Sequence, residues 1–235
     1  MRTIIVGDVH GCREELEALL DRVAFTSGDR LIFVGDLVAR GPDSLGVLDV
    51  ARRTGAIVVR GNHEQKLLDL RATPLTAGLP RGIGRLHRDL ASRLRPTDWT
   101  LLATSPVYLD LPEHGLRVVH AGLMPGVPLE DQSPRTLLRI RTVRVAEGES
   151  RLWGEVWAGP PQVVFGHNAA PGLQLHPWAT GLDTGCVYGG RLTAMVLDEK
   201  QRVPRAIAAR RALLVGEPAH RVWCEPGVDV TARGT

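Results

Sequence analysis

Three short apolar runs near the beginning of the chain each end at a glycine-marked polar motif. They cover Arg2 to Val6, Arg30 to Val34 and Ala56 to Arg60, and their β-branched content predicts buried strands. Between them, Cys12 to Val23 and the segment that begins at Pro42 repeat apolar residues at the spacing of a helix face. This β-α-β-α-β order predicts a parallel sheet whose ligand site lies beyond the carboxyl ends of the strands.

The middle of the chain has a helical, arginine-rich pattern from His63 to about Thr104, interrupted by a Thr-Pro step and a glycine-marked loop. We expect residues 64–104 to form a helical cap beside the ligand site. Strand signals return after Ser105-Pro106 and predict a second sheet that packs on the first. The runs that carry these signals are Val107 to Leu111, Leu116 to His120, Gln162 to Phe165, Arg191 to Leu197 and Val203 to Ile207.

The remaining stretches are less regular. Residues 124–160 are rich in loop signals, with one short helix expected near Pro134 to Arg141. The segment after about residue 210 is expected to be a C-terminal tail that wraps the body or frays. A chain of 235 residues with 43% hydrophobic content can bury one sizeable core, so we expect a single α/β domain over residues 1–235.

Composition and charge narrow the setting of the protein. The cysteines (Cys12, Cys186 and Cys224) lack the spacing of a zinc ribbon or a disulfide framework, and the first residues resemble a core strand rather than a signal peptide. No apolar stretch approaches the length of a membrane span. We therefore expect a cytoplasmic protein. The net charge of +3 is too mild to argue by itself for nucleic acid as a partner.

Candidate metal ligands directly follow the three early strand-like runs. Asp8 and His10 are two residues apart at an extended strand end, so their side chains point to the same side and can bind one metal ion. Asp36 can bridge two cations through its carboxylate, and the neutral amide of Asn62 suits a terminal ligand of the second ion. A single Asp or Asn beside a glycine would be read as a turn former. Together they predict a two-metal phosphoesterase centre.

Two later histidines complete the set of candidate ligands. His120 and His167 each close a strand-like run, and each has a glycine within two residues. The chain's second asparagine, Asn168, directly follows His167. Four other histidines lack such a context, and we expect them at the surface or, at most, in support of the ligands: His87, His114, His176 and His220.

The motifs Gly-Asp-x-His-Gly, Gly-Asp-x-Val-x-Arg-Gly, Gly-Asn-His-Glu, His-Ala-Gly and Gly-His occur in this order between residues 7 and 167. In this combination the chain resembles the calcineurin-like metallophosphoesterase superfamily, in its phosphoprotein phosphatase branch. The resemblance implies two mixed β-sheets packed as a sandwich flanked by helices, with a dinuclear site at the strand ends. It also implies two divalent cations, Mn²⁺ before iron or zinc, held by Asp8, His10, Asp36, Asn62, His120 and His167.

Ala39 is the main departure from this branch. Its protein phosphatases have an acidic residue at this position, which orients the histidine that matches His63. The segment around Ala39 and the later run Gly181 to Gly190 resemble the symmetrical diadenosine tetraphosphatases instead. The stretch Val119 to Leu129 and the compact length are closer to the broader ApaH-like phosphatases, whose substrates vary.

These features predict an enzyme that hydrolyses a phosphoanhydride or phosphoester with a metal-bridging hydroxide as nucleophile. Arg40 and Arg60 are expected to bind phosphate oxygens through their planar forks, with Asn62 beside them. His63 is expected to protonate the leaving group or to stabilise the charge that develops on it. Because a nucleotide leaves as a stable anion, the missing carboxylate at Ala39 favours an anhydride. The expected substrate is diadenosine tetraphosphate or a related nucleoside polyphosphate.

Other functions stay open on the sequence alone. A serine/threonine protein phosphatase or an endopolyphosphatase would use the same ligands. The arginine clusters Arg81 to Arg95 and Arg202 to Arg211 suggest a third hypothesis, a non-catalytic nucleic-acid-binding module. Such a module would not need the metal ligands. Nucleic acid is otherwise expected only as a substrate of the capped-RNA type. A base-stacking platform is a further hypothesis for the aromatic residues Trp153, Trp157, Trp178 and Tyr188, although such residues more often form core.

Overall fold

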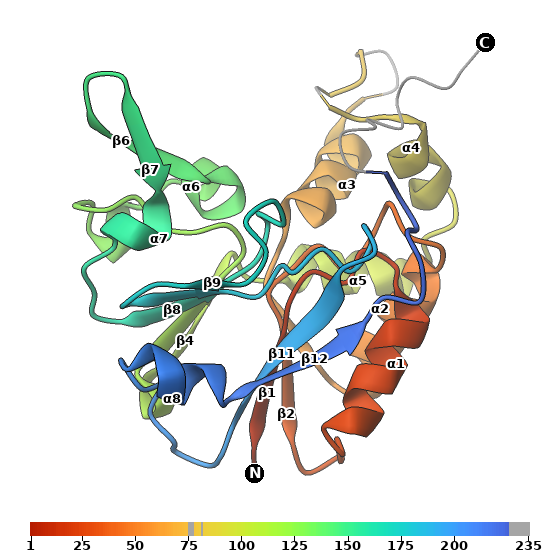
Figure 1. Ribbon diagram of the computed structural model, residues 1–235. Coiled ribbons are helices and arrows are strands. Elements are labelled where there is room, and N and C mark those ends of the chain that lie inside the picture. Colours follow the sequence, from red (N-terminus) through yellow and green to blue (C-terminus); the bar gives the residue numbers. More distant parts are fainter. Residues whose placement is uncertain (75–77, 81, 226–235) are drawn as a thin grey trace.

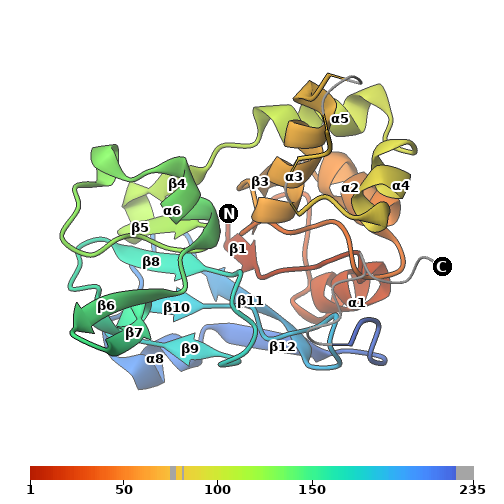
Figure 2. The same cartoon turned by 90° about the horizontal axis from the view of Figure 1, so that it is seen from above.

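The first sheet is built around β1 (Thr3–Val6), as Figures 1 and 2 show for the computed structural model, which describes residues 1–74, 78–80 and 82–225. β1 pairs in parallel with β2 (Arg30–Phe33), and β2 pairs in parallel with β3 (Ile57–Val58). The parallel arrangement predicted for the first three strands is therefore confirmed. On its other side β1 pairs antiparallel with β11 (Arg191–Leu197), and β12 (Leu214–Pro218) adds the outer edge.

The second sheet contains strands from the second half of the chain. Three parallel strands form its centre, and an antiparallel strand lies at each edge. In spatial order they are β4 (Tyr108–Leu111), β5 (Leu116–Val119), β8 (Gln162–Phe165), β10 (Ala179–Gly181) and β9 (Gln174–Leu175). A separate hairpin of β6 (Thr142–Ala146) and β7 (Glu149–Leu152) projects away from both sheets (Figure 1).

Helices cover the outer faces of the two sheets. Local signals explain several of their ends: the side chain of Asp43 accepts from the backbone N–H of Gly46 at 2.8 Å at the start of α2, and Pro96 opens α5. The helices are α1 (Arg13–Arg22), α2 (Ser44–Arg53), α3 (Asn62–Ala72), α4 (Arg85–Ala91), α5 (Pro96–Thr104), α6 (Pro134–Arg139), α7 (Trp153–Val156) and α8 (Ile207–Arg211), with single 3₁₀ turns at Pro112–His114 and Leu129–Asp131.

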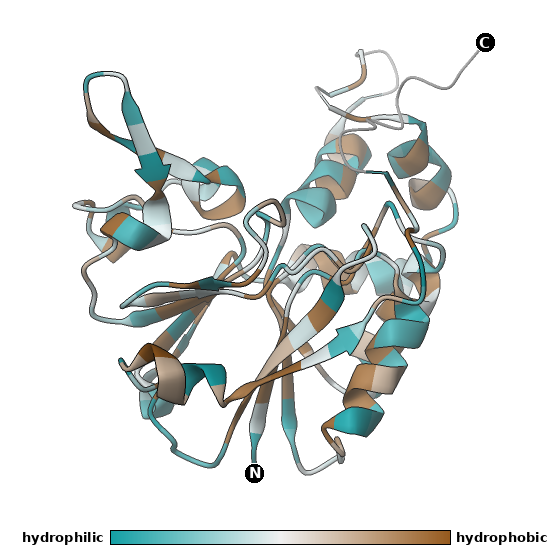
Figure 3. Ribbon diagram, in the orientation of Figure 1, coloured by the Kyte–Doolittle hydropathy of each residue, from teal (hydrophilic) through white to brown (hydrophobic). Residues whose placement is uncertain are grey.

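Alternation along the strands divides the core into layers. In β1, Ile4 and Val6 pack in the cluster that contains the α1 residue Leu16, whereas Ile5 packs with Val118 of the second sheet. A further cluster covers the outer face of the second sheet. In Figure 3 the ribbon of α1 carries both hydrophobic and hydrophilic stretches. The layers confirm the expected sandwich of two mixed sheets flanked by helices.

Some elements differ from the sequence-based expectations. Val203 to Ile207 forms no strand: the backbone N–H of Val203 donates to the carbonyl of His114, and Ile207 begins α8. The segment after residue 210 contributes β12, and Trp223 donates to Glu15 at 2.7 Å, so it belongs to the body as far as residue 225. The last part of the expected tail, residues 226–235, and residues 75–77 and 81 of the expected cap lie outside the described residues.

Within the described ranges, no helix has both the length and the apolar character needed to cross a membrane. The three cysteines are free thiols, of which Cys12 and Cys186 are buried.

Candidate metal centre

The loops that follow β1 and β2 meet at the carboxyl edge of the first sheet, as expected for parallel strands. Their backbones are joined by a hydrogen bond of 2.8 Å from the N–H of His10 to the carbonyl of Asp36. His10, Asp36 and His167 all have positive φ angles, of 49°, 50° and 69°. Non-glycine residues rarely adopt this conformation, and it is concentrated at functional sites.

A buried carboxylate connects the loop after β2 to the start of α3. Glu64 accepts hydrogen bonds from the backbone N–H groups of Asp36 (2.8 Å), Leu37 (2.9 Å) and Gly61 (2.9 Å). Burial and the neighbouring Asp36 raise the pKa of Glu64 to about 8, while the backbone N–H donors of Asp36 and Gly61 act in the opposite direction. Glu64 therefore fixes the backbone from which the Asp36 side chain projects.

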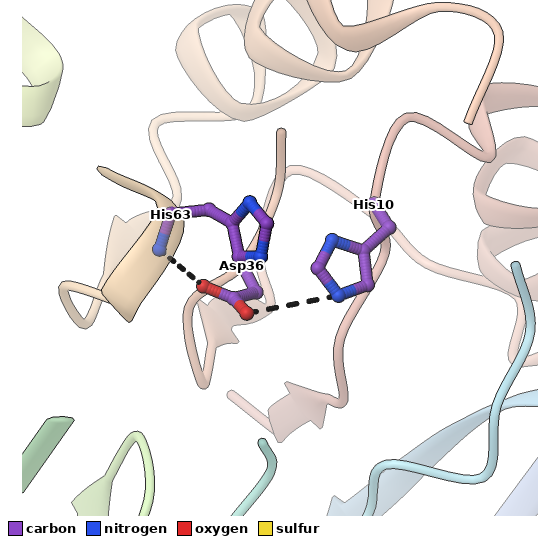
Figure 4. Close-up of side chains that lie close together, drawn as sticks. All are labelled: His10, Asp36 and His63. Carbon is purple, nitrogen blue, oxygen red and sulfur yellow. Dashed lines mark hydrogen bonds and ion pairs between the residues drawn. The ribbon is translucent and has the colours of Figure 1, made fainter. Parts of the chain in front are cut away.

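Two groups of potential metal ligands share Asp36. One consists of His10, Asp36 and His63 (Figure 4), the other of Asp36, His120 and His167, and the potential ligand atoms within each group lie within 4.8 Å of one another. Oδ2 of Asp36 is 3.6 Å from Nε2 of His10, and Oδ1 is 3.5 Å from Nε2 of His120. A carboxylate placed between two sets of imidazoles fits the predicted bridging role.

Hydrogen bonds to backbone carbonyls orient two of these imidazoles. Nδ1 of His10 lies 3.1 Å from the carbonyl of Val38, and Nδ1 of His120 lies 3.0 Å from that of Val34, so Nε2 of each ring is directed at Asp36. Metal-binding histidines commonly use their second nitrogen in this way. Burial, assisted by Arg40, lowers the pKa of His10 to about 4, which leaves the ring neutral and able to bind a cation at neutral pH.

Asn62 and Asp8 lie next to the two groups. Oδ1 of Asn62 is 3.1 Å from Nε2 of His120. Both carboxylate oxygens of Asp8 accept from the backbone N–H of His167 at 3.1 Å. Only glycine fits at position 166, because a Cβ there would lie 1.9 Å from Oδ1 of Asp8. Burial, together with the charges of Asp183 and Asp36, raises the pKa of Asp8 well above its usual range. A nearby cation would relieve this repulsion.

The two arginines predicted to bind phosphate have different surroundings. Nη1 of Arg40 lies 2.6 Å from Nε2 of His10, so its positive charge is at the ligand cluster. The Arg60 guanidinium instead donates to the carbonyls of Ala103 (3.0 Å) and Ser105 (2.8 Å). Nη1 of Arg60 donates to Oε1 of Gln65 at 3.2 Å, so the guanidinium connects α3 with the end of α5. A role of Arg60 in phosphate binding stays a prediction.

A cavity of about 550 Å³ opens beside the ligand cluster and contains functional candidates that the sequence analysis missed. Arg40 and Arg141 both line it, with His167, Asp183 and Tyr188. Arg141 follows α6 without a motif of its own, so no local signal identifies it. Asp183 lies in the run Gly181 to Gly190, and the resemblance of this run to the symmetrical diadenosine tetraphosphatases was the sequence signal that could have identified it. Burial raises the pKa of Asp183 to about 6.

Of the aromatic residues considered as a stacking platform, Tyr188 lines this cavity, and the Arg40 guanidinium carbon lies 5.6 Å from its ring centre. Trp153 is buried in the core against Phe165 instead. Two arginines of the predicted nucleic-acid-binding clusters have other roles in the structure: Arg95 forms an ion pair with Asp98, and Arg210 is fully buried. Arg81 lies outside the described residues.

His63 lies at the edge of the ligand cluster. Its backbone N–H donates to Oδ1 of Asp36 at 2.9 Å, and its ring centre is 5.0 Å from that of His10. Burial lowers the pKa of His63 well below its usual range. Nδ1 of His63 lies 3.1 Å from Nε2 of His87, a buried side chain of α4. Of the two positions expected for His87, at the surface or in support of the site, the structure has the second.

The donor set as a whole fits a pair of divalent cations. It combines carboxylate and amide oxygens with neutral imidazole nitrogens, it contains no thiolate, and Asp36 belongs to both ligand groups. These donors suit Mn²⁺, Fe²⁺ or Zn²⁺.

Comparison with known proteins agrees with this geometry. Residues 1–205 match the family model described as calcineurin-like phosphoesterase. The chain is 26% identical to an Oceanobacillus iheyensis protein named bis(5'-nucleosyl)-tetraphosphatase PrpE [asymmetrical], over 91% of this chain and 95% of that one. Its sequence is also 37% identical to that of a protein whose crystal structure is described as a provisionally assigned diadenosine tetraphosphatase. The two structures agree with a TM-score of 0.77, and the match covers 93% of each chain.

A protein serine/threonine phosphatase from Saccharomyces cerevisiae, with similarity to human phosphatase PP5, is 16% identical with a TM-score of 0.58. That match covers 94% of this chain and 80% of the yeast chain, and it shows the shared fold alone.

Proposed function

Because the chain belongs to the calcineurin-like phosphoesterase family, we propose that it hydrolyses a phosphoanhydride bond of diadenosine tetraphosphate or a related nucleoside polyphosphate. One observation carries the proposal: the carboxylate of Asp36 belongs to both ligand groups, next to a cavity that two arginines line. This arrangement serves reactions at phosphorus, where negative charge on several oxygens must be neutralised together.

The cations would be held by Asp8, His10, Asp36, Asn62, His120 and His167, with Asp36 between them. When bound, two divalent cations lower the pKa of a water that can attack phosphorus and neutralise the phosphoryl oxygens. We propose Mn²⁺ as the ions, because the resemblance to the phosphoprotein phosphatase branch implies it and the oxygen and imidazole donors are compatible with it.

The cavity supplies the groups that bind the rest of the substrate. Arg40 and Arg141 would bind non-bridging phosphate oxygens of the polyphosphate chain. Tyr188 offers a flat surface at the cavity wall for the nucleoside. The leaving group of an anhydride is a stable phosphate anion, which needs hydrogen-bond donation from His63 more than full proton transfer.

Product analysis tells which anhydride bond is cut. The resemblance of the sequence to symmetrical enzymes predicts two ADP from diadenosine tetraphosphate, whereas the curated relatives are named as asymmetrical. We propose asymmetrical cleavage, to ATP and AMP, because those relatives match the chain over nearly its whole length. The Oceanobacillus iheyensis protein, for example, is 26% identical over 91% of this chain. Chromatography of the nucleotide products separates the two outcomes.

The test is a substrate panel on Mn²⁺-loaded protein: diadenosine tetraphosphate, long-chain polyphosphate and a phosphoserine peptide. We expect the dinucleotide to have the highest kcat/KM, and Asp36→Asn to abolish turnover together with metal binding. A higher kcat/KM for the peptide would support a protein phosphatase instead, and shortening of long polyphosphate in preference to the dinucleotide would support an endopolyphosphatase.

A further inference from the structure

The buried imidazole of His87 lies within hydrogen-bond distance of His63. Ala39 has no group that can hydrogen-bond to an imidazole, yet Nδ1 of His63 is not left without a partner. Nε2 of His87 lies 3.1 Å from it, and the two rings are 5.1 Å apart between centres with an angle of 23° between their planes. Both side chains are buried, so water does not compete strongly for this contact.

The position of α4 explains how His87 reaches the site. A small cavity of about 240 Å³ lies between the loop that contains Ala39 and Arg40 and the α4 residues Leu86 and Leu90. The helix therefore approaches the site at the small residue, and it presents His87 from the turn between these leucines. A segment predicted only as a cap thus contributes a side chain to the catalytic arrangement.

The remaining contacts of His63 leave its orientation dependent on Nδ1. The hydrogen bond to Asp36 comes from the backbone of His63 and does not hold the ring. Nε2 of His63 is buried and has no hydrogen-bond partner among the described residues. This nitrogen is the one that faces the ligand cluster, because Nδ1 is directed at α4.

We propose that His87 is a positioning residue for His63, a role that rests on the proposed hydrolysis of an anhydride. His87 donates its Nε2–H to Nδ1 of His63, so the proton of His63 is held on Nε2, on the side of the substrate. As the bond between phosphorus and the bridging oxygen breaks, Nε2–H of His63 donates a hydrogen bond to that oxygen. The leaving phosphate keeps the electron pair, and no proton transfer is required.

Kinetics of matched variants test this role on Mn²⁺-loaded protein with diadenosine tetraphosphate. His87→Phe keeps an aromatic ring without a donor, and His87→Gln keeps an amide N–H donor. We expect kcat to fall about ten-fold or more in His87→Phe, with KM and metal content little changed, and to recover partly in His87→Gln. His176→Phe, at a half-buried histidine of another loop, controls for the general cost of the exchange.

A second step separates positioning from a structural role. In a His63→Ala background, His87→Phe should leave kcat unchanged, because there is no ring left to orient. Long-range ¹H–¹⁵N NMR of histidine-labelled, metal-free protein should show the Nε2–H tautomer of His63 in the wild type and a mixture of tautomers in His87→Phe.

Three results would overturn the role: unchanged kcat in His87→Phe, an equal further loss of kcat in the His63→Ala background, or an Nδ1–H tautomer in the wild type. If the protein does not turn over the dinucleotide at all, the proposed function fails, while the NMR measurement still decides on the contact with His87.

Discussion

Replacement of Glu64 by glutamine tests whether a buried carboxylate holds the metal-binding loops. Oε2 of Glu64 accepts from the N–H groups of Asp36 and Gly61, and Oε1 accepts from that of Leu37. In Glu64→Gln the amide oxygen can keep the first two bonds, but the amide nitrogen then faces the N–H of Leu37, donor against donor. The shape of the side chain is unchanged, so the exchange affects charge and hydrogen bonding alone.

The size of the effect follows from these three bonds. A buried N–H left without an acceptor costs about 1–3 kcal/mol, and the two remaining bonds each lose about 1 kcal/mol when the acceptor becomes neutral. The free energy of unfolding of Glu64→Gln should therefore be about 3–5 kcal/mol lower, a large part of the stability of an ordinary domain. Because Asp36 projects from the same backbone, the affinity for Mn²⁺ should fall as well.

Burial raises the pKa of Glu64 to about 8, so urea denaturation of metal-free protein at a pH above that value measures the loss, and a titration with Mn²⁺ measures the affinity. Glu17→Gln is the control, since Glu17 forms exposed ion pairs with Arg13 and Arg53 and should change stability by less than about 1 kcal/mol. If Glu64→Gln is as stable as the wild type, Glu64 is protonated in the folded protein and the carboxylate does not hold the loops.

Three further outcomes are expected. Arg60→Ala should lower the free energy of unfolding by about 1–3 kcal/mol in urea and leave KM for the dinucleotide unchanged, because its donors bind backbone carbonyls; a raised KM at full stability would return Arg60 to the substrate site. Gly166→Ala should weaken Mn²⁺ binding in a titration, since the new Cβ would meet Asp8 at 1.9 Å, and wild-type affinity would contradict the close approach. The folded-state pKa of His10, lowered from 6.5 to about 4, means that its protonation favours the unfolded chain, so metal-free protein should lose stability as the pH falls from 6.5 toward 4. The urea midpoint of His10→Gln should fall less steeply with decreasing pH than that of the wild type. An identical pH dependence in the two proteins would refute the lowered pKa of His10.

Regular periodicity made much of the fold predictable. The strands near residues 2–6, 30–34, 162–165 and 191–197 carry runs of apolar residues, several of them β-branched, and the helices after Cys12 and Pro42 repeat leucine and valine on one face. The β6–β7 hairpin was missed because its short alternation lies in a loop-rich, mostly exposed stretch, where burial gives no strong pattern. In β12, glycine and proline conceal a strand that pairing with β11 stabilises.

The candidate ligands were predictable because each follows a strand within a few residues, whereas the supporting residues were not. Contact between His87 and His63 spans 24 positions and depends on how α4 packs, for which the sequence has no local signal. The same holds for Arg141 in the cavity. For Arg60 the motif suggested substrate binding, whereas in the structure its Nη2 donates to backbone carbonyls at the end of α5, a contact that the motif does not indicate.

The pairing of β1 with β11 has a consequence for synthesis of the chain. Thr3 pairs with Leu197, so β1 keeps one edge unpaired until the chain has been synthesised as far as β11. Asp8, His10, Asp36 and Asn62 emerge early, but His120 and His167 follow only after the α3–α5 segment. An exposed strand edge and an incomplete ligand set therefore persist together through much of translation, a period in which aggregation or early capture of a metal ion competes with folding.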